Sequence, residues 1–555
     1  MKNLLHTPDG VRDIYNGEYD DKCRIEDTVA RIFKEARYQG IQTPSFEYYD
    51  LFGSDISTTP GRDLYRFTDL DGETVVLRSD FTPSIARCAA KYFTKDDDVL
   101  KLTYKGNTFS QTSQMQGKLR ETTQMGVDMI GDGSVAADVE VIKLAIKTLS
   151  GVSDKKAVVI LSHIDFFSGL CEEFGLDKAS ELTLRDFVKN KNFVAARQFL
   201  ENLVINGQPL KRDRIERIMQ LEQLIGGELV LDSAKKLVYN KTSLRAIDRL
   251  KRIYEALETE GLGDKVYFDL SMLSKYGYYT GVVFKAYMSG VGDCVAKGGR
   301  YDNLLREFGK DSPAMGFVIV IDDLLQAVRA PEDDIRDNYL TFALTKGRLA
   351  DKTLQMLEKI GISCEEVKDK DTRKLVFVND EHKIRFFLAK GPDVPTYVES
   401  GVADIGVVGK DTIIEENRRI YEVLDLGFGK CRMCVCGPKS AGKLLQTNEK
   451  IRVCTKYPTI ARDYFHNKKH QTVDLIKLNG SVELGPIIGL GDVIVDIVET
   501  GSTLRENGLE ILEEICPLSA RMVVNQVSMQ LKAYKIKDII EKLKELEINE
   551  NFKAK

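Results

Sequence analysis

Residues 483–504, with the sequence ELGPIIGLGDVIVDIVETGSTL, carry the most informative pattern in the chain. The apolar run VIVDIV at 493–498 includes one carboxylate, Asp496, and is typical of a buried strand. A small, hydroxyl-rich turn follows at 499–503, and the residues from Leu504 onward predict a helix. Backbone N–H groups converge where a strand turns into a helix, and the helix dipole favours negative charge there. We therefore expect an anion site at this turn.

The residue types in the turn favour a phosphorylated ribose as the anion. Three hydroxyl groups and a glycine form the expected phosphate cradle: Thr500, Gly501, Ser502 and Thr503. The turn contains no lysine, so it is not the Walker-type loop. Asp496 and Glu499 flank the cradle, where carboxylates suit sugar hydroxyls or a magnesium ion. The alternative is an ordinary strand–turn–helix corner, which a TGST sequence alone would favour.

The spaced pattern resembles the signature of ATP phosphoribosyltransferase, the first enzyme of histidine biosynthesis. It consists of Glu483, Gly489, Asp496 and the run TGSTL at 500–504. The resemblance implies that N1 of the adenine of ATP displaces pyrophosphate from C1 of phosphoribosyl pyrophosphate, which gives N1-(5-phosphoribosyl)-ATP. It also implies Mg²⁺ as a cofactor that the substrates carry, near Asp496 and without fixed protein ligands. Catalytic roles are expected for Asp496 and Glu499.

Residues at the ends of other expected strands complete the substrate sites that this family implies. The expected ligands of ATP or pyrophosphate are Lys346, Gly347, Arg348, Lys390 and Thr455. Lys346 and Arg348 are also expected to act in catalysis, because cations hold phosphate groups. Lys456 is expected to bind phosphoribosyl pyrophosphate together with Glu499 and the turn. Lys390 stands where the family usually has arginine, so the charge remains without the planar fork.

Length and composition limit the class of protein. At 555 residues, the chain predicts three or four domains. A hydrophobic content of 43% with 30% charged residues is typical of a soluble globular protein, and a net charge of −5 argues against a polyanionic partner. Ten cysteines without paired spacings, together with no signal peptide and no membrane-spanning apolar run, predict a cytoplasmic protein. Neither the cysteines at 431–436 nor the five histidines have metal-site spacing.

The first half of the chain predicts helices packed on a sheet. Residues 18–39 carry apolar positions at helical spacing, with Gly40 as the stop. The segments 65–67 and 75–77 flank a turn and predict a β-hairpin. Residues 150–262 are expected to be mainly helical.

This half resembles the catalytic domain of histidyl-tRNA synthetase, a class II synthetase. The matching segments span most of residues 1–328 and lie at 77–87, 109–131, 278–281 and 298–302. The resemblance implies an α+β domain with an antiparallel sheet and helices. The segment 150–262 matches the inserted domain of that family only loosely.

Functional arginines of a synthetase are missing from this half. Such an enzyme needs arginines to hold the phosphates of ATP. Ungapped comparison with the family places Ser110, Thr112, Ser274 and Asp323 where functional arginine or glutamate residues are expected. Residues 329–338 predict an exposed linker instead of an anticodon-binding domain. The pattern is similar to the regulatory subunit that accompanies short ATP phosphoribosyltransferases, and it implies no tRNA partner.

A histidine-binding pocket is expected to survive in this half. Its candidate residues are Asp80, Gln124, Asp128, Tyr278 and Tyr279. Asp80 suits an α-amino group, Gln124 and Asp128 suit an imidazole or ammonium group, and the tyrosines suit the wall. Histidine is therefore the expected inhibitor. The alternative is a polar cleft without a ligand, although convergent polar groups in a pocket favour binding.

The expected architecture is a class II synthetase-like α+β domain followed by a two-lobed α/β domain of the periplasmic-binding-protein type. The parts are a regulatory domain at 1–328, a linker at 329–338 and a catalytic domain at 339–555. Lobe I is expected at about 339–430 and 521–555, and lobe II at about 431–520. The chain after the phosphate turn is too short for the regulatory domain of the long-form enzyme. Analogy with the family's complexes favours a homo-oligomer, specifically a tetramer.

Three other functions compete with this interpretation. A tRNA-binding module is disfavoured by the acidic balance and the missing anticodon domain. A bifunctional enzyme that also charges tRNA is disfavoured by Ser110, Ser274 and Asp323. A purine-salvage phosphoribosyltransferase is disfavoured by the KGR run at 346–348 and by Glu483. No membrane partner is expected.

Overall fold

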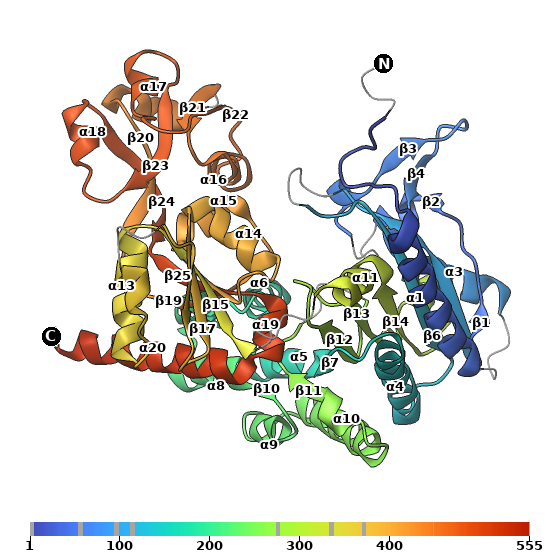
Figure 1. Cartoon of the computed structure of the whole chain (residues 1–555). Helices are drawn as coiled ribbons and strands as arrows, with labels where there is room; N and C mark the ends of the chain where they lie inside the picture. The colour runs from blue at the N-terminus through green and yellow to red at the C-terminus, as the bar shows by residue number, and fades with distance from the viewer. Residues whose placement is uncertain are drawn as a thin grey trace. The chain divides into compact units, whose positions relative to one another are not determined.

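The computed structural model describes residues 5–53, 59–93, 99–111, 117–273, 278–331, 338–368, 373–447 and 449–553. The chain forms two compact units, Met1–Asp333 and Asp334–Lys555 (Figure 1). Among the described residues, no helix combines the length and the apolarity needed to cross a lipid bilayer.

The N-terminal unit is built on a nine-stranded sheet, and the antiparallel sheet with helices predicted for this half is present. The pairs β1–β5 and β7–β11 run parallel, and the other neighbouring pairs are antiparallel. In order across the sheet, the strands are β1 (Gln39–Gly40), β5 (Leu100–Phe109), β6 (Glu121–Ile130), β14 (Ala314–Val320), β13 (Ala296–Arg300), β12 (Val282–Met288), β7 (Ala157–His163), β11 (Val266–Asp269) and β10 (Ile225–Gly226).

Strand β6 shows how the sheet separates the large hydrophobic core from a face on which polar side chains lie beside a smaller hydrophobic cluster. Met125, Val127 and Met129 belong to the large core of the unit. Side chains alternate along a strand, so Gln124 and Asp128 project to the opposite face. The histidine pocket expected from the sequence therefore lies on the face away from the large core.

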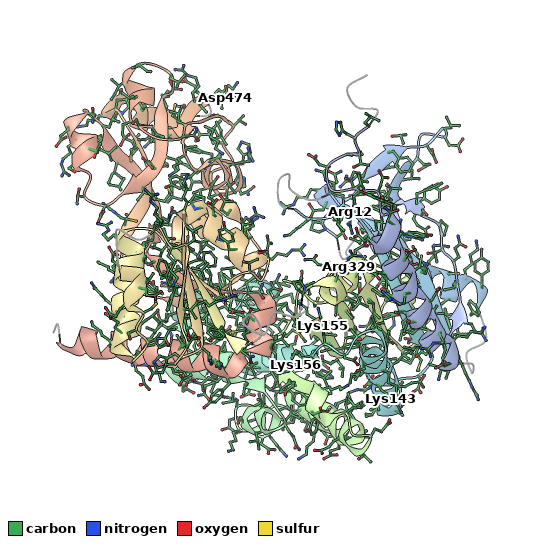
Figure 2. All side chains as sticks on the ribbon, in the orientation of Figure 1. Arg12, Lys143, Lys155, Lys156, Arg329 and Asp474 are labelled. Atoms are coloured by element: carbon green, nitrogen blue, oxygen red, sulfur yellow. The ribbon has the colours of Figure 1, made fainter. Side chains whose placement is uncertain are left out.

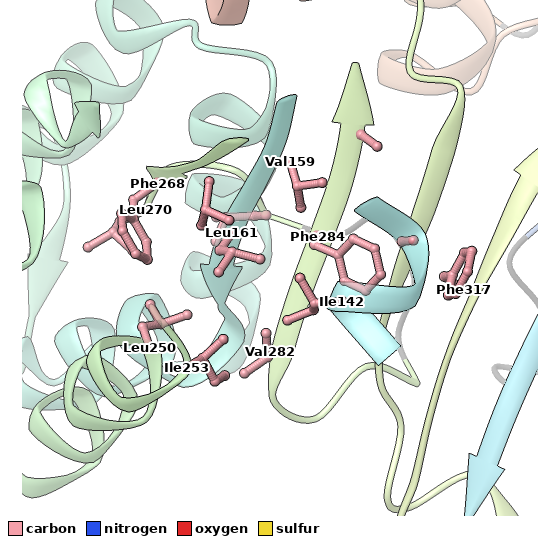
Figure 3. Packing of buried hydrophobic residues seen from close by; sticks show 14 of the residues in the cluster. Ile142, Val159, Leu161, Leu250, Ile253, Phe268, Leu270, Val282, Phe284 and Phe317 are labelled. Atoms are coloured by element: carbon pink, nitrogen blue, oxygen red, sulfur yellow. The ribbon is translucent and has the colours of Figure 1, made fainter. Parts of the chain in front are cut away.

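Helices cover the core face of this sheet. Leu250 and Ile253 of one helix belong to the same core as Leu161 and Val282 of the sheet (Figure 3). The helices of the unit are α1 (Asn16–Glu35), α2 (Tyr49–Gly53), α3 (Thr82–Tyr92), α4 (Val135–Val152), α5 (Ile164–Phe174), α6 (Lys178–Lys189), α7 (Phe193–Glu201), α8 (Arg212–Met219), α9 (Leu229–Lys235), α10 (Lys241–Thr259) and α11 (Ile321–Arg329).

Two details of this unit differ from the sequence-based expectation. The helix predicted at 18–39 ends at Glu35, because Arg37 adopts a left-handed φ of 64° and residues 39–40 form strand β1. The segment 150–262 holds helices α5–α10 and the short strands β8 (Val204–Ile205) and β9 (Gln208–Pro209), but it also contributes β7 and β10 to the central sheet. The continuous apolar run AVVIL of β7 is compatible with a buried strand as well as with a helix.

The hairpin predicted near residue 70 is confirmed. Strand β3 (Arg66–Thr68) pairs with β4 (Thr74–Leu77) in an antiparallel register that sets Arg66 opposite Val76. A third strand, β2 (Phe46–Tyr48), completes this small sheet.

The end of α11 is fixed to the rest of the N-terminal unit. Arg329 donates to Asp21 of α1 at 2.7 Å, and the ammonium of Lys155 donates to the carbonyl of Ala327 at 2.7 Å (Figure 2). The linker expected at 329–338 therefore overlaps the end of α11 at Arg329, and its residues 332–337 lie outside the described part of the chain.

The C-terminal unit contains two separate sheets, each mixed and each covered by helices (Figure 1). In order, the first consists of β16 (Val376–Asn379), β17 (Ile384–Ala389), β15 (Leu340–Thr345), β18 (Ile405–Gly409), β25 (Ala520–Val524) and β19 (Tyr421–Asp425). In order, the second consists of β22 (Val473–Lys477), β21 (Ile451–Thr455), β23 (Val493–Val498), β20 (Cys431–Gly437) and β24 (Glu510–Leu518). The chain thus crosses to the second sheet after β19 and returns before β25.

The helices of this unit follow the strands closely, as an α/β fold requires. They are α13 (Arg348–Lys359), α14 (Val394–Glu399), α15 (Lys410–Glu416), α16 (Pro458–Arg462), α17 (Leu484–Ile487), α18 (Ser502–Glu506), α19 (Gln526–Leu531) and α20 (Ala533–Lys553). The buried strand predicted from VIVDIV is confirmed as β23, while the helix after it begins at Ser502, two residues earlier than Leu504.

Candidate active site

The hydroxyl-rich turn lies at the carboxyl end of β23. Strands β22, β21 and β23 run parallel, so their carboxyl ends meet at one edge of the second sheet. Gly501 has a φ of 71°, a left-handed conformation that a glycine adopts without strain. The hydroxyl groups of Thr500 and Ser502 lie 3.1 Å apart, and the turn is accessible to solvent. These donors therefore face a ligand position at the sheet edge.

Asp496 provides a half-buried carboxylate beside this turn. The pKa of Asp496 is raised to about 6, chiefly by burial and also by the carboxylates of Glu483 and Asp411, against the lowering effects of the Ile497 N–H at 2.8 Å and the charge of Lys456. A carboxyl group in such surroundings gains from a ligand that donates hydrogen bonds or brings positive charge.

The end of the neighbouring strand β21 presents one exposed cation and one buried hydroxyl. Lys456 is exposed. Thr455 is fully buried, and its hydroxyl donates to the carbonyl of Val495 at 2.7 Å and accepts the N–H of Tyr457 at 2.8 Å. The Thr455 side chain therefore holds the turn in shape.

The first sheet contributes the other expected cations. Gly347 adopts a φ of 94° at the start of α13, which allows the chain to turn sharply between Lys346 and Arg348. The Lys346 N–H donates to the carbonyl of Ala389 at 2.9 Å, so Lys346 lies beside the end of β17, where Lys390 follows. All three cationic side chains are exposed at the carboxyl edge of parallel strands.

Three contacts connect the two sheets at these edges. Arg348 forms an ion pair with Glu499 at 3.2 Å. The Glu415 carboxylate of α15 accepts backbone N–H groups at the start of α16. Tyr457 at the start of α16 lies near Asp411 of α15, and burial together with the charge of Asp411 raises the pKa of this tyrosine. Of the expected ligands, these contacts bring Arg348 next to Glu499, at the start of the hydroxyl-rich turn.

Three of these residues had no assigned role at the level of sequence: Asp411, Glu415 and Tyr457. Asp411 and Glu415 follow β18 in the same strand–turn–helix arrangement that marked the phosphate turn. This strand–turn–helix arrangement was the only local indication of a role for Asp411 and Glu415. Their partners near α16 lie more than 40 positions away in the sequence, so no local pattern identifies them.

The polar face of the N-terminal unit brings together the residues expected to bind histidine. Asp128 is buried; its Oδ1 accepts the hydroxyl of Tyr301, and its Oδ2 has no hydrogen-bond partner among the residues that the structure describes. Burial raises the pKa of Asp128 to about 7, and the charge of Asp80 adds to the shift. Tyr278 donates to Asp80 at 3.3 Å, and its ring centroid lies 4.7 Å from that of Tyr279.

Two further features shape this pocket. Gln124 lies on the same face of β6 as Asp128 and is 8% exposed. A Cβ atom at Gly316 would lie 1.9 Å from an oxygen of Asp128, so a glycine is required beneath the carboxylate. Tyr301, which sequence reasoning did not select, is the hydroxyl donor to Asp128.

The structure describes two of the four positions at which functional synthetase residues are replaced. Ser110 follows β5, and its N–H donates to the carbonyl of Arg120 at 2.9 Å. Asp323 lies in the first turn of α11. Thr112 and Ser274 lie outside the described residues.

Comparison with known proteins gives two family matches. The histidyl-tRNA synthetase family matches residues 10–324, and the ATP phosphoribosyltransferase family matches residues 390–545. The ATP phosphoribosyltransferase of Lachnoclostridium phytofermentans is 69% identical over 208 residues, which cover 38% of this chain and 97% of that protein.

The regulatory half has its own relatives. The ATP phosphoribosyltransferase regulatory subunit of Clostridium botulinum is 32% identical over 413 residues, which cover 74% of this chain and 97% of that protein. The crystal structure of an ATP phosphoribosyltransferase regulatory subunit/histidyl-tRNA synthetase from Bacillus halodurans is similar with a TM-score of 0.55 and 28% identity, covering 70% of this chain and 99% of that one. The chain therefore belongs to the ATP phosphoribosyltransferase family, as a histidine-biosynthesis transferase in which a regulatory domain of the histidyl-tRNA synthetase family precedes a short-form catalytic domain.

Proposed function

We propose that the turn 500–503 holds the 5-phosphate of phosphoribosyl pyrophosphate. The observation that carries this assignment is the left-handed Gly501 turn at the end of β23, with accessible hydroxyls and with Asp496 beside it. Phosphate groups favour convergent backbone N–H groups and hydroxyl donors. Asp496 and Glu499 then accept hydrogen bonds from the ribose hydroxyls.

The leaving pyrophosphate is assigned to the cations of the first sheet. Cleavage of the bond between C1 and pyrophosphate leaves positive charge on the ribose ring and negative charge on the leaving group. Lys346, Arg348 and Lys390 stabilise that negative charge, while the ring is held near carboxylates. N1 of the adenine of ATP attacks C1 and forms N1-(5-phosphoribosyl)-ATP. Binding fixes the two substrates in line, which supplies much of the rate acceleration.

We assign Lys456 to the binding of phosphoribosyl pyrophosphate. The turn whose conformation Thr455 stabilises is assigned to the binding of ATP. The exposed ammonium of Lys456 and its position beside Asp496 support the first assignment. The hydroxyl of Thr455 is committed to the fold, so its contribution is to position the backbone of the turn.

We propose that Mg²⁺ enters the site bound to the substrates and is not held by fixed protein ligands. The half-buried carboxylate of Asp496, near Glu483, fits the hard oxygen donors that Mg²⁺ prefers. Within the described ranges, no group of three or more histidine, cysteine, aspartate or glutamate side chains is arranged to hold a metal ion. The ion supplies charge neutralisation of the pyrophosphate when it arrives with the substrate.

The N-terminal unit is proposed to bind histidine and to inhibit the catalytic domain. The buried Asp128 with an unpartnered Oδ2, next to Gln124 and the tyrosine wall, supports an imidazole position. Asp80 supports the α-amino position. The two sites lie on different domains, so inhibition requires a coupling free energy, commonly about 1–3 kcal/mol. Fusion raises the effective concentration of the two domains to the order of millimolar.

The test of histidine inhibition compares wild type with Asp80→Ala and Gln124→Ala. The expected result is a loss of inhibition at unchanged activity without histidine. Asp71→Ala is the matched control, because it removes an exposed carboxylate from the same unit. Unchanged inhibition in both pocket variants would place the histidine site elsewhere.

The regulatory half is proposed to lack synthetase chemistry and to have no tRNA partner. Ser110 and Asp323 stand where phosphate-binding arginines are expected. Histidine-dependent exchange between ATP and labelled pyrophosphate should therefore be absent when phosphoribosyl pyrophosphate is omitted. Measurable exchange would show that the activation step persists.

We further propose domain boundaries at 1–328, 329–338 and 339–555, with lobe I at about 339–430 and 521–555 and lobe II at about 431–520. The division of strands between the two C-terminal sheets supports the lobes. A homo-oligomer, with a tetramer favoured, is proposed by analogy with complexes of separate catalytic and regulatory subunits, and native mass spectrometry measures it.

A further inference from the structure

A second pocket lies in the N-terminal unit, away from the expected histidine site. It has a volume of about 570 Å³ and lies between α10, the start of α4 and the end of β7. His163 follows Val159 and Leu161 at two-residue intervals along β7, so it projects to the core face of the sheet. Asp128 projects to the opposite face, so the two sites are separated by the sheet.

Three cations of α10 line this pocket without a partner. Lys241, Arg245 and Arg252 are spaced so that they share one face of the helix. None of them forms an ion pair or a hydrogen bond with any other residue that the structure describes. Their positive charge is therefore available to a bound anion.

A fourth cation supports the wall of the pocket. Arg249 donates to Asp138 at 2.6 Å and to the carbonyl of Gly133 at 2.9 Å. Asp138 also accepts from Arg300 of β13 at 2.9 Å. These contacts fix the distance between α10 and the start of α4, which keeps the pocket open.

A buried side chain directs a free donor into the same pocket. His163 is 5% exposed, and its Nδ1 accepts the N–H of Asp165 at 3.2 Å. Burial, together with the charges of Arg249 and Arg300, lowers the pKa of His163 to about 3, so the ring is neutral and its proton is on Nε2. Nε2 has no partner among the described residues. This N–H lines the pocket and is available to an oxygen or nitrogen of a ligand.

Two carboxyl groups supply hydrogen-bond acceptors in the same pocket as the cationic donors of α10. Asp165 and Asp248 also line the pocket. Burial and the charge of Asp302 raise the pKa of Asp165. A simple inorganic anion would gain nothing from these carboxyl groups, whereas a ligand that combines an anion with hydroxyl groups would use both sets.

We propose that this pocket binds a small phosphorylated sugar, either free or as part of a nucleotide. Lys241, Arg245 and Arg252 hold the phosphate, because charge-assisted hydrogen bonds to phosphate are strong. Asp165 and Asp248 accept the sugar hydroxyls, and the Nε2–H of His163 donates to a ligand oxygen or ring nitrogen. The volume lies within the range of small-molecule sites. The proposal does not depend on the assignments in the catalytic domain.

The test is hydrogen–deuterium exchange of the full chain with ribose 5-phosphate, with AMP and with inorganic phosphate as probes. Exchange is read in segments, so binding at the pocket is distinguished from binding in the catalytic domain. We expect slower exchange at 163–165 and 241–252 with ribose 5-phosphate or AMP, at concentrations well below those at which inorganic phosphate has an effect. The first two probes distinguish a free sugar phosphate from a nucleotide.

Two variants make the result specific. The double variant Arg245→Gln/Arg252→Gln alters exposed residues and should weaken the protection by about tenfold or more for each guanidinium, with ATP phosphoribosyl transfer unchanged. The matched control Lys235→Gln/Lys236→Gln removes two exposed cations at the end of α9 and should leave the protection intact. The variant His163→Leu removes the Nε2–H donor and should also weaken binding.

Three outcomes would overturn the proposal. The first is no protection of 241–252 by either sugar phosphate. The second is protection that is the same in wild type and in Arg245→Gln/Arg252→Gln. The third is protection by an RNA hairpin but not by the small probes, which would make the basic face of α10 a nucleic-acid surface.

Discussion

Arg348 and Glu499 form a two-point ion pair, although they belong to elements of different sheets. The guanidinium nitrogens lie 3.2 and 3.4 Å from the two carboxylate oxygens. Arg348 begins α13 of the first sheet, and Glu499 follows β23 of the second. The side chains are 67% and 54% exposed. In the proposed function, each of the two side chains holds a different part of phosphoribosyl pyrophosphate.

The first prediction is that Arg348→Gln impairs substrate binding without destabilising the fold. An exposed ion pair contributes only about 0–1 kcal/mol to the free energy of unfolding. A guanidinium that holds a charged leaving group contributes more, so kcat/KM should fall by about tenfold or more. Thermal melting and steady-state kinetics measure the two quantities.

The matched control for Arg348 is Lys450→Gln. Lys450 forms an ion pair with Asp474 at 2.7 Å, and the two side chains are 64% and 50% exposed. The pair lies at the amino ends of β21 and β22, opposite to the edge that carries the phosphate turn, and its loss should leave kcat/KM unchanged. Equal kinetic losses in the two variants would show that the Arg348–Glu499 pair has only a general structural effect.

The second prediction concerns the hydroxyls of the phosphate turn. Thr500→Val and Thr503→Val each remove a hydroxyl that would donate to a charged phosphate, a contact worth about 1.5–3 kcal/mol. The affinity for phosphoribosyl pyrophosphate should fall by about one to two orders of magnitude. The control Thr472→Val alters an exposed threonine before β22, at the opposite end of the parallel strands. Wild-type kinetics in both turn variants would exclude this turn as the phosphate site.

The third prediction follows from the contact between Glu415 and α16. The carboxylate accepts the N–H groups of Thr459 and Ile460, each at 3.1 Å. It therefore caps a helix of the other sheet and fixes the turn that carries Lys456. Glu415→Ala should raise KM for phosphoribosyl pyrophosphate several-fold, because loss of a helix cap typically costs about 1 kcal/mol.

The Glu415 series separates positioning from a general loss of stability. Glu415→Gln keeps an acceptor oxygen and should be less affected than Glu415→Ala. The control Glu416→Ala removes the neighbouring carboxylate, for which the described part of the chain offers no hydrogen-bond partner. If KM stays constant while kcat and the melting temperature fall together in all three variants, Glu415 does not position the turn.

Local parts of the fold and site could be predicted because their signals are local. The strand 493–498 and the turn after it follow from an apolar run, a glycine and hydroxyl residues within a dozen positions. The hairpin 66–77 likewise follows from neighbouring residues. The end of α1 could not be predicted, because the left-handed conformation of Arg37 is imposed by pairing of 39–40 with the distant strand β5.

Contacts between segments far apart in the sequence could not be predicted, because no local pattern marks them. Arg348 and Glu499 are 151 positions apart, and Glu415 and Thr459 are 44 apart. Their residue types suggested ligands, but only the folded chain brings Arg348 to Glu499 and Glu415 to α16. The hydrogen bond from the Thr455 hydroxyl to the carbonyl of Val495 could not be predicted either, because Val495 lies on another strand.

The fourth prediction is a pH dependence of stability that originates at Asp128. Burial raises the pKa of Asp128 from its ordinary value of 3.8 to about 7, with a further contribution from the charge of Asp80. Between these two values the native state keeps a proton that the unfolded state has released. The free energy of unfolding therefore falls as pH rises from about 4 to about 7 and is constant above that range.

Asp128→Asn should remove this pH dependence, because an amide of nearly the same shape has no charge to bury. We expect the melting temperature of wild type to fall relative to Asp128→Asn as pH rises toward 7, with a limit on the order of 4 kcal/mol for the full change. Asp71→Asn, on the exposed hairpin turn, corrects for the general effect of losing a carboxyl group. Differential scanning calorimetry between about pH 5 and 8 covers the steep part of the curve. A constant difference between wild type and Asp128→Asn across this range would mean that Asp128 is ionised throughout, and the unpartnered Oδ2 would then face a compensating charge.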